Sequence, residues 1–248
     1  TIVDGEGRIV ASAVTPRTIR PQETELFDGE LEVCNPKRWS PASPALYKAV
    51  SVVTAADGTP CDRYESVFGI RTFVWNSDER RLYVNGEPVN IQGFNRHQEY
   101  PWLGDAIPYF IHRMDLLDMK RNLNCTALRP GQYCSGPEVF ALADSLGLIT
   151  FAELPNVKNR PFSPEAQWMQ TVEMVRRLRN NPSVLLFDMG DETDRAADSR
   201  WAYMESPGHF ITCRHCLGSG GRFVNITPQE LRMSKMLRCA VRGWYGDD

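Results

Sequence analysis

The chain of 248 residues contains no apolar run that approaches the roughly 20 residues needed to cross a lipid bilayer. It has no long basic stretch, and its net charge of -3 does not favour a nucleic-acid partner. It has no initiator methionine, and its first residues lack the basic start and apolar segment of a signal peptide. These absences predict a protein without a membrane span and a chain that begins inside a longer protein. The compartment stays open, with the periplasm or the cell exterior preferred.

Cysteine is also sparse, and its pattern does not indicate a disulfide framework. The seven cysteines are scattered and odd in number: Cys34, Cys61, Cys125, Cys134, Cys213, Cys216 and Cys239. Cys213 and Cys216 form one Cys-x-x-Cys unit, but a zinc site usually needs four ligands, and only Cys239 follows. We therefore expect these three residues to be unreactive, buried thiols and not a metal site. A zinc site formed by Cys213, Cys216 and Cys239 is the alternative.

Residues 1–72 show the features of a partial β-sandwich. Strand-like runs occur at 9–14, 31–34 and 47–53, and Asp57-Gly58 is a turn signal after the last of them. The segment 35–46 contains three prolines, a density that excludes a helix or a central strand. We expect this segment to be a rigid loop in which Trp39 is packed as an anchor.

From residue 73 onward the pattern changes to alternating strands and helices. A hairpin with a type I′ turn is predicted at Asn85-Gly86, between strands 82–84 and 89–91. Helical spacing follows at 109–122, 137–146 and 163–179, with Gly147 as a helix cap. Four strands are expected between Asn90 and Glu192, and the runs 223–226 and 240–245 are candidates for a fifth and a sixth.

This alternation predicts an α/β fold with parallel strands and right-handed crossovers. Residues 73–248 are therefore predicted to be an incomplete (β/α)8 TIM barrel of about six strands, and residues 1–72 an immunoglobulin-like β-sandwich segment. Because an open barrel exposes strand edges and core, we expect the native protein to continue beyond Asp248.

One stretch, residues 181–192, is central to the functional interpretation. It begins with Asn181-Pro182, continues as a short apolar run and ends in Gly190-Asp191-Glu192. Such a run is typical of a strand buried on both faces, and barrel chemistry lies at the carboxyl ends of such strands. Alternatively, the two acids merely open the next helix, where negative charge suits the helix dipole.

Polar side chains follow all four predicted strands. They are Asn95, Arg96 and His97, then Arg129, then Glu153, and then Asp191 and Glu192. In a parallel barrel these residues all lie at one face, and together they suit polyol recognition and general acid/base chemistry. Glu192 is the candidate catalytic acid, and the other six are candidate substrate-binding residues.

These segments resemble glycoside hydrolase family 2, which contains β-galactosidases, β-glucuronidases and β-mannosidases. The matching segments are Trp39-Ser40-Pro41 to Tyr47, Phe68-Gly69-Ile70-Arg71, Gly93-Phe94-Asn95-Arg96-His97, Asn124 to Arg129, and Asn181 to Glu192. The resemblance implies a retaining exo-β-glycosidase, β-galactosidase-like, that releases terminal β-linked sugars from oligo- or polysaccharides. Glu192 matches the acid/base. The family's nucleophile glutamate has no counterpart before Asp248.

Several positions depart from the family pattern. Asp191 replaces the asparagine that contacts the sugar 2-hydroxyl, Phe187 replaces a tryptophan, and Gln132-Tyr133-Cys134 replaces His-Tyr-Pro. Val157 and Asn159 occupy the positions of two magnesium-associated residues, so we expect neither magnesium nor another cofactor. A carbohydrate-binding or scaffold protein on a decayed barrel is therefore the second hypothesis. The expected partners are a carbohydrate and the rest of a longer chain, and a homo-oligomer stays open.

Overall fold

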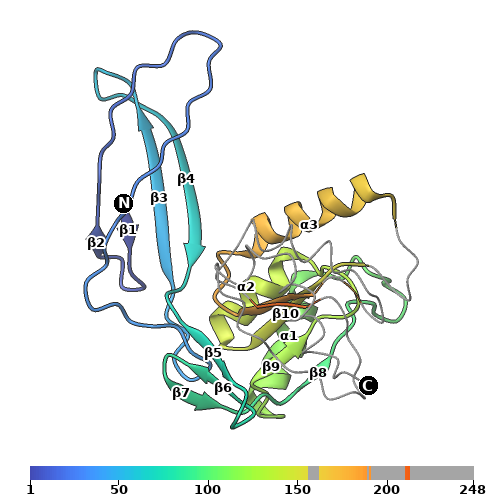
Figure 1. Cartoon of the computed structure of the whole chain (residues 1–248). Coiled ribbons are helices and arrows are strands. Elements are labelled where there is room, and N and C mark those ends of the chain that lie inside the picture. Colours follow the sequence, from blue (N-terminus) through green and yellow to red (C-terminus); the bar gives the residue numbers. More distant parts are fainter. Residues whose placement is uncertain (156–161, 189, 191–209, 213–248) are drawn as a thin grey trace.

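The computed structural model describes residues 1–155, 162–188, 190 and 210–212. For residues 210–212 it describes the backbone alone. It begins with a four-stranded antiparallel sheet of order β2-β1-β3-β4. The strands are β1 (Ile2–Val3), β2 (Ile9–Ala11), β3 (Tyr47–Thr54) and β4 (Pro60–Phe68). Figure 1 shows the long hairpin of β3 and β4 standing to one side of the barrel elements.

Three details of this sheet differ from the sequence prediction. Only the first three residues of the run 9–14 form a strand, and the predicted strand Leu31–Cys34 is wrong, because this run pairs with no other strand and is largely exposed. The strand β4 was missed, since its sequence is mostly polar. It forms because the turn at Gly58, which has φ +86°, brings it back along the whole of β3.

A small antiparallel meander follows, made of β5 (Phe73–Asn76), β6 (Arg81–Val84) and β7 (Glu87–Val89). The predicted hairpin between the last two strands is confirmed, although its second strand spans Glu87–Val89 and not residues 89–91. Asn85 has φ 56° and Gly86 has φ 91°, and positive φ at both central residues is what a type I′ turn requires.

The barrel elements alternate as predicted from β8 (Gly93–Asn95) to β11 (Val184–Asp188). Between these lie α1 (Tyr109–Arg121), β9 (Ala127–Arg129), α2 (Pro137–Leu146), β10 (Ile149–Glu153) and α3 (Pro164–Leu178). A further strand, β12 (Phe210–Thr212), pairs with β11. The strands form one parallel sheet of order β12-β11-β10-β9-β8. The fifth strand therefore lies at Phe210–Thr212 and not at 223–226, and the runs 223–226 and 240–245 lie outside the described residues.

The helix boundaries follow local chemistry. Gly147 ends α2 with φ 70°, which confirms the predicted cap, and a side chain at this position would collide with the carbonyl of Pro41. At the start of α3, Ser163 accepts a hydrogen bond from the amide of Ala166 at 3.2 Å. Gly147 thus fixes where α2 ends before β10, and Ser163 fixes where α3 begins.

The proline-containing loop 35–46 attaches the sandwich segment to the barrel through Trp39. The indole is fully buried, and its Nε1 donates to the carbonyl of Asp144 at 2.8 Å. It packs in one cluster with Leu82, Ala127 and Leu185, which belong to the meander and the barrel strands. The predicted anchoring role of Trp39 is confirmed. The guanidinium of Arg71 adds a second attachment, because it donates to the carbonyls of Pro182 and Val184 at 3.2 and 3.0 Å.

We expect Trp39→Ala to destabilise the protein by about 3–5 kcal/mol, the usual cost of removing a buried aromatic side chain. Trp39→Phe keeps most of the apolar contact but leaves the Asp144 carbonyl without its donor, which costs about 1 kcal/mol. Denaturant unfolding of each variant measures both values. Trp102→Ala is the matched control, because Trp102 is fully exposed and its loss should change stability by at most about 0.5 kcal/mol.

Candidate active site

The carboxyl ends of the barrel strands form a row of polar residues in register. Asn95 on β8 pairs with Arg129 on β9, and Glu153 on β10 pairs with Asp188 on β11. Register partners on neighbouring parallel strands project toward the same side of the sheet. The sandwich segment contacts the opposite, amino-terminal end of β11, at Pro182 and Val184. The strand-end row therefore lies on the side of the barrel that the sandwich does not cover.

A buried ion pair joins two of the predicted site residues. Arg129 donates from Nε and Nη2 to the two carboxylate oxygens of Glu153, both at 2.9 Å. Arg129 is 6% exposed and Glu153 is completely buried. Bidentate geometry gives both groups a fixed orientation, which a binding or catalytic site requires. The structure thus brings together Arg129 and Glu153, as predicted for the ends of neighbouring strands.

Asp188 is a buried carboxylate at this edge that sequence reasoning missed. It is 1% exposed, it is the register partner of Glu153, and its Oδ1 accepts a hydrogen bond from the amide of Gly190 at 3.3 Å. The signal was present, since an acid closes an otherwise apolar run. Gly190 is buried and has φ 134°, a conformation that favours glycine. Gly190 lies directly before Asp191 and Glu192 in the sequence.

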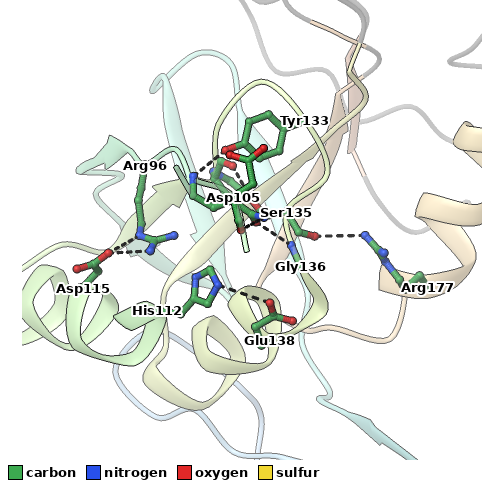
Figure 2. Close-up of polar contacts among 11 residues, drawn as sticks. Arg96, Asp105, His112, Asp115, Tyr133, Ser135, Gly136, Glu138 and Arg177 are labelled. Atoms are coloured by element: carbon green, nitrogen blue, oxygen red, sulfur yellow. Dashed lines mark hydrogen bonds and ion pairs between the residues drawn. The ribbon is translucent and has the colours of Figure 1, made fainter. Parts of the chain in front are cut away.

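The side chain of Arg96 contacts helix α1 instead of the strand-end row. Its Nε and Nη2 donate to Asp115 Oδ2 at 2.9 and 2.7 Å, while its backbone amide donates to the carbonyl of Arg129 at 2.8 Å. Figure 2 shows the imidazole of His112 beside this guanidinium, with His112 Nε2 3.5 Å from Glu138 Oε1. Burial lowers the pKa of His112, and the Arg96 charge lowers it further. The described contacts of Arg96 are therefore those of a residue that fixes the end of β8.

His97 belongs to a second polar cluster, around Tyr133. The two rings meet edge to face with centroids 5.8 Å apart, and His97 Nδ1 lies 3.3 Å from Glu99 Oε2. The Tyr133 hydroxyl donates to Glu99 at 2.9 Å and accepts from the amide of Gln98 at 2.6 Å. Burial and the Glu99 carboxylate raise the pKa of Tyr133 to about 12, so it stays a hydrogen-bond donor. This cluster ties the loop after β8 to the loop after β9, a connection that the sequence did not reveal.

Some predicted residues lie outside the described part of the chain. Asp191, Glu192 and the three cysteines Cys213, Cys216 and Cys239 are among them. Within the described ranges, no group of three or more His, Cys, Asp or Glu side chains is arranged to hold a metal ion. In the same ranges, none of the helices combines the length and the apolar composition needed to cross a membrane.

The fold and the strand-end row define the class: part of a (β/α)8 barrel preceded by an immunoglobulin-like β-sandwich segment, with buried charged residues at the carboxyl ends of its strands. The chain belongs to glycosyl hydrolases family 2. The model of that family's TIM barrel domain matches residues 76–206, and a second model of the family matches residues 1–71. The predicted family and fold class are confirmed.

The chain is similar to longer proteins. It is 30% identical over 209 residues to a β-galactosidase of Thermoanaerobacter pseudethanolicus, covering 82% of this chain and 27% of that protein. A β-galactosidase of Vibrio cholerae is 29% identical over 191 residues, which is 71% of this chain and 18% of the relative. The crystal structure of a Bacteroides uniformis β-glucuronidase superimposes with a TM-score of 0.79 at 22% identity, over 85% of this chain and 28% of that one. The chain thus spans between 18% and 28% of the length of these proteins.

Proposed function

We propose that the protein is a retaining exo-β-glycosidase, β-galactosidase-like in its action on terminal β-linked sugars. The observation that carries the proposal is the buried row of Arg129, Glu153 and Asp188 at the ends of neighbouring parallel strands. The last member of the row, Asp188, lies four positions before Glu192 in the sequence. Glu192 matches the acid/base position of the family. The two β-galactosidases with about 30% identity support the choice of galactosides within the family.

In this mechanism Glu192 protonates the leaving oxygen, and a glutamate from outside residues 1–248 attacks the anomeric carbon. Retention requires the two carboxyl groups to be about 5 Å apart. At that distance like-charge repulsion keeps Glu192 protonated until it has donated its proton. Arg129 and Glu153 would orient the bound sugar or the residues that contact it, because their own geometry is fixed by mutual hydrogen bonds.

The test is hydrolysis by the full-length protein that contains this chain. A panel of 4-nitrophenyl β-galactoside, β-glucuronide, β-mannoside and β-glucoside identifies the sugar, and NMR of the first-formed product identifies the anomer. We expect the β-galactoside to be the best substrate and the β-anomer to form first. An initial α-anomer would exclude retention, and a clear preference for another sugar would replace the galactoside assignment.

The departures at Asp191, Phe187 and Gln132 favour one other candidate, a carbohydrate-binding or scaffold protein that does not turn its ligand over. The same panel separates the two functions. Binding of a β-linked oligosaccharide without any release of product would support this second candidate, while measurable turnover would remove it.

A further inference from the structure

The loop that follows β8 presents a tryptophan entirely to solvent. Trp102 is 100% exposed, and Tyr100 and Leu103 beside it are 36% and 49% exposed. An exposed indole does not contribute the stabilising free energy that burial of its large apolar surface would give. Grouped exposed apolar side chains commonly mark a binding surface.

Trp102 is held in this position by its backbone. Its φ is 64°, in the left-handed region that non-glycine residues rarely adopt, and strain of this kind concentrates at functional sites. Three hydrogen bonds close the turn: Tyr100 and Gly104 exchange amide-to-carbonyl bonds of 3.0 Å each, and the Leu103 amide donates to the Tyr100 carbonyl at 3.1 Å. The indole therefore projects from a closed turn and not from a freely moving chain end.

Gln98 fastens this turn to the barrel. Its Nε2 donates to the carbonyl of Asp105 at 3.1 Å, its Oε1 accepts from the amide of Gly136 at 3.2 Å, and its own amide donates to the Tyr133 hydroxyl. Figure 2 shows Asp105 and Tyr133 close together on this side of the barrel. Since the loop leaves the carboxyl end of β8, it lies on the same face as the strand-end row. The turn is thus a fixed part of the rim of the candidate active site.

We propose that Trp102 stacks against a pyranose ring on the leaving-group side of the bond that is cleaved. The C–H bonds on one face of a β-linked pyranose make an apolar surface that matches an indole. The exposed carboxylate of Asp105, directly after the turn, offers a hydrogen-bond acceptor to the hydroxyls at the ring edge. In this arrangement the terminal sugar, whose glycosidic bond is hydrolysed, binds at the buried row. The fully exposed Trp102 then contacts the neighbouring sugar, which departs as the leaving group. This inference rests on the proposed function, and it makes a saccharide the preferred leaving group.

The experiment compares two substrates that share the cleaved sugar and differ on the leaving-group side. For a galactoside specificity these are lactose, whose leaving group is glucose, and β-galactosyl fluoride, whose leaving group is the fluoride ion and carries no sugar. For another sugar, the corresponding disaccharide and glycosyl fluoride replace them. In the full-length protein, Trp102→Asn removes the ring while keeping a residue that tolerates positive φ. We expect kcat/KM for the disaccharide to fall about tenfold, a loss of about 1.4 kcal/mol, and kcat/KM for the fluoride to stay unchanged.

Two further variants sharpen the result. Trp102→Phe keeps an aromatic face and should recover part of the loss. Tyr64→Asn removes an aromatic side chain that is 71% exposed on β4, away from the strand ends, and should leave both substrates unaffected. Equal rates of Trp102→Asn and wild type on both substrates would overturn the inference. So would an equal loss on both substrates, because a damaged loop or site would slow the fluoride as well.

Failure of the proposed function gives a different result, since the wild type would then hydrolyse neither substrate. In that case calorimetric titration with the disaccharide decides the inference. Weaker binding by Trp102→Asn than by the wild type would support a stacking surface, and equal binding would contradict it.

Discussion

Glu192→Gln in the full-length protein is expected to lower kcat for β-glycosides with poor leaving groups by about 10²–10⁴-fold, the usual contribution of general acid/base catalysis. The amide keeps the size of the carboxyl group but supplies no proton to the leaving oxygen. Sugars and alkyl alcohols need that proton in order to leave. The rate of product release from lactose and from a methyl β-glycoside measures the effect.

Activated substrates make this prediction specific to the acid/base role. The 2,4-dinitrophenolate of a 2,4-dinitrophenyl β-glycoside leaves without protonation. The variant should therefore release one equivalent of dinitrophenolate in a burst, as the glycosyl-enzyme forms, and then stall. Added azide is a nucleophile that needs no general base, so it should attack the glycosyl-enzyme and restore turnover. The product would then be the glycosyl azide. Glu165→Gln, the same change at an exposed residue of α3, is the control and should behave as the wild type. Wild-type turnover of lactose by Glu192→Gln would rule out the assignment.

Elements whose cause is local were predictable from the sequence. The turn at Asn85-Gly86, the cap at Gly147 and the helix start at Ser163 were read from short motifs, and each is present. Elements that depend on a distant partner were not. The polar strand β4 exists through its pairing with β3, and the alternating run Leu31–Cys34 has no strand to pair with. Alternation over four residues indicates strand propensity, but the strand forms only where a neighbouring strand supplies the hydrogen bonds.

The candidate site was predictable to a similar extent, for the same reason. Strand order placed Arg129 and Glu153 at one edge, and they form an ion pair there. Strand order does not predict the direction of the Arg96 side chain, because the partner of this side chain, Asp115, lies on the following helix. Asp188 was missed because it was counted within the apolar run of its strand. The roles toward a substrate of all the predicted site residues, Arg129 and Glu153 included, stay predictions, and so does the domain boundary at residue 72.

Glu153→Ala is expected to destabilise the protein by about 3–5 kcal/mol, because it leaves the Arg129 guanidinium buried without the carboxylate that balances its charge. Denaturant unfolding of the full-length protein measures the loss. An effect below about 1 kcal/mol would show that water or another group readily replaces the carboxylate. Glu65→Ala, which removes a salt-bridged but partly exposed glutamate of β4, is the control and should cost at most about 1 kcal/mol.

The double variant Arg129→Met/Glu153→Leu separates stability from function. Replacing a buried ion pair by apolar side chains of similar volume is often neutral or stabilising, because it removes the cost of dehydrating two charges. We therefore expect the double variant to recover most of the stability that Glu153→Ala loses. If the pair orients the bound sugar, hydrolysis stays strongly reduced in this stable protein. Recovery of both stability and activity would instead identify Arg129 and Glu153 as a structural ion pair without a role toward the substrate.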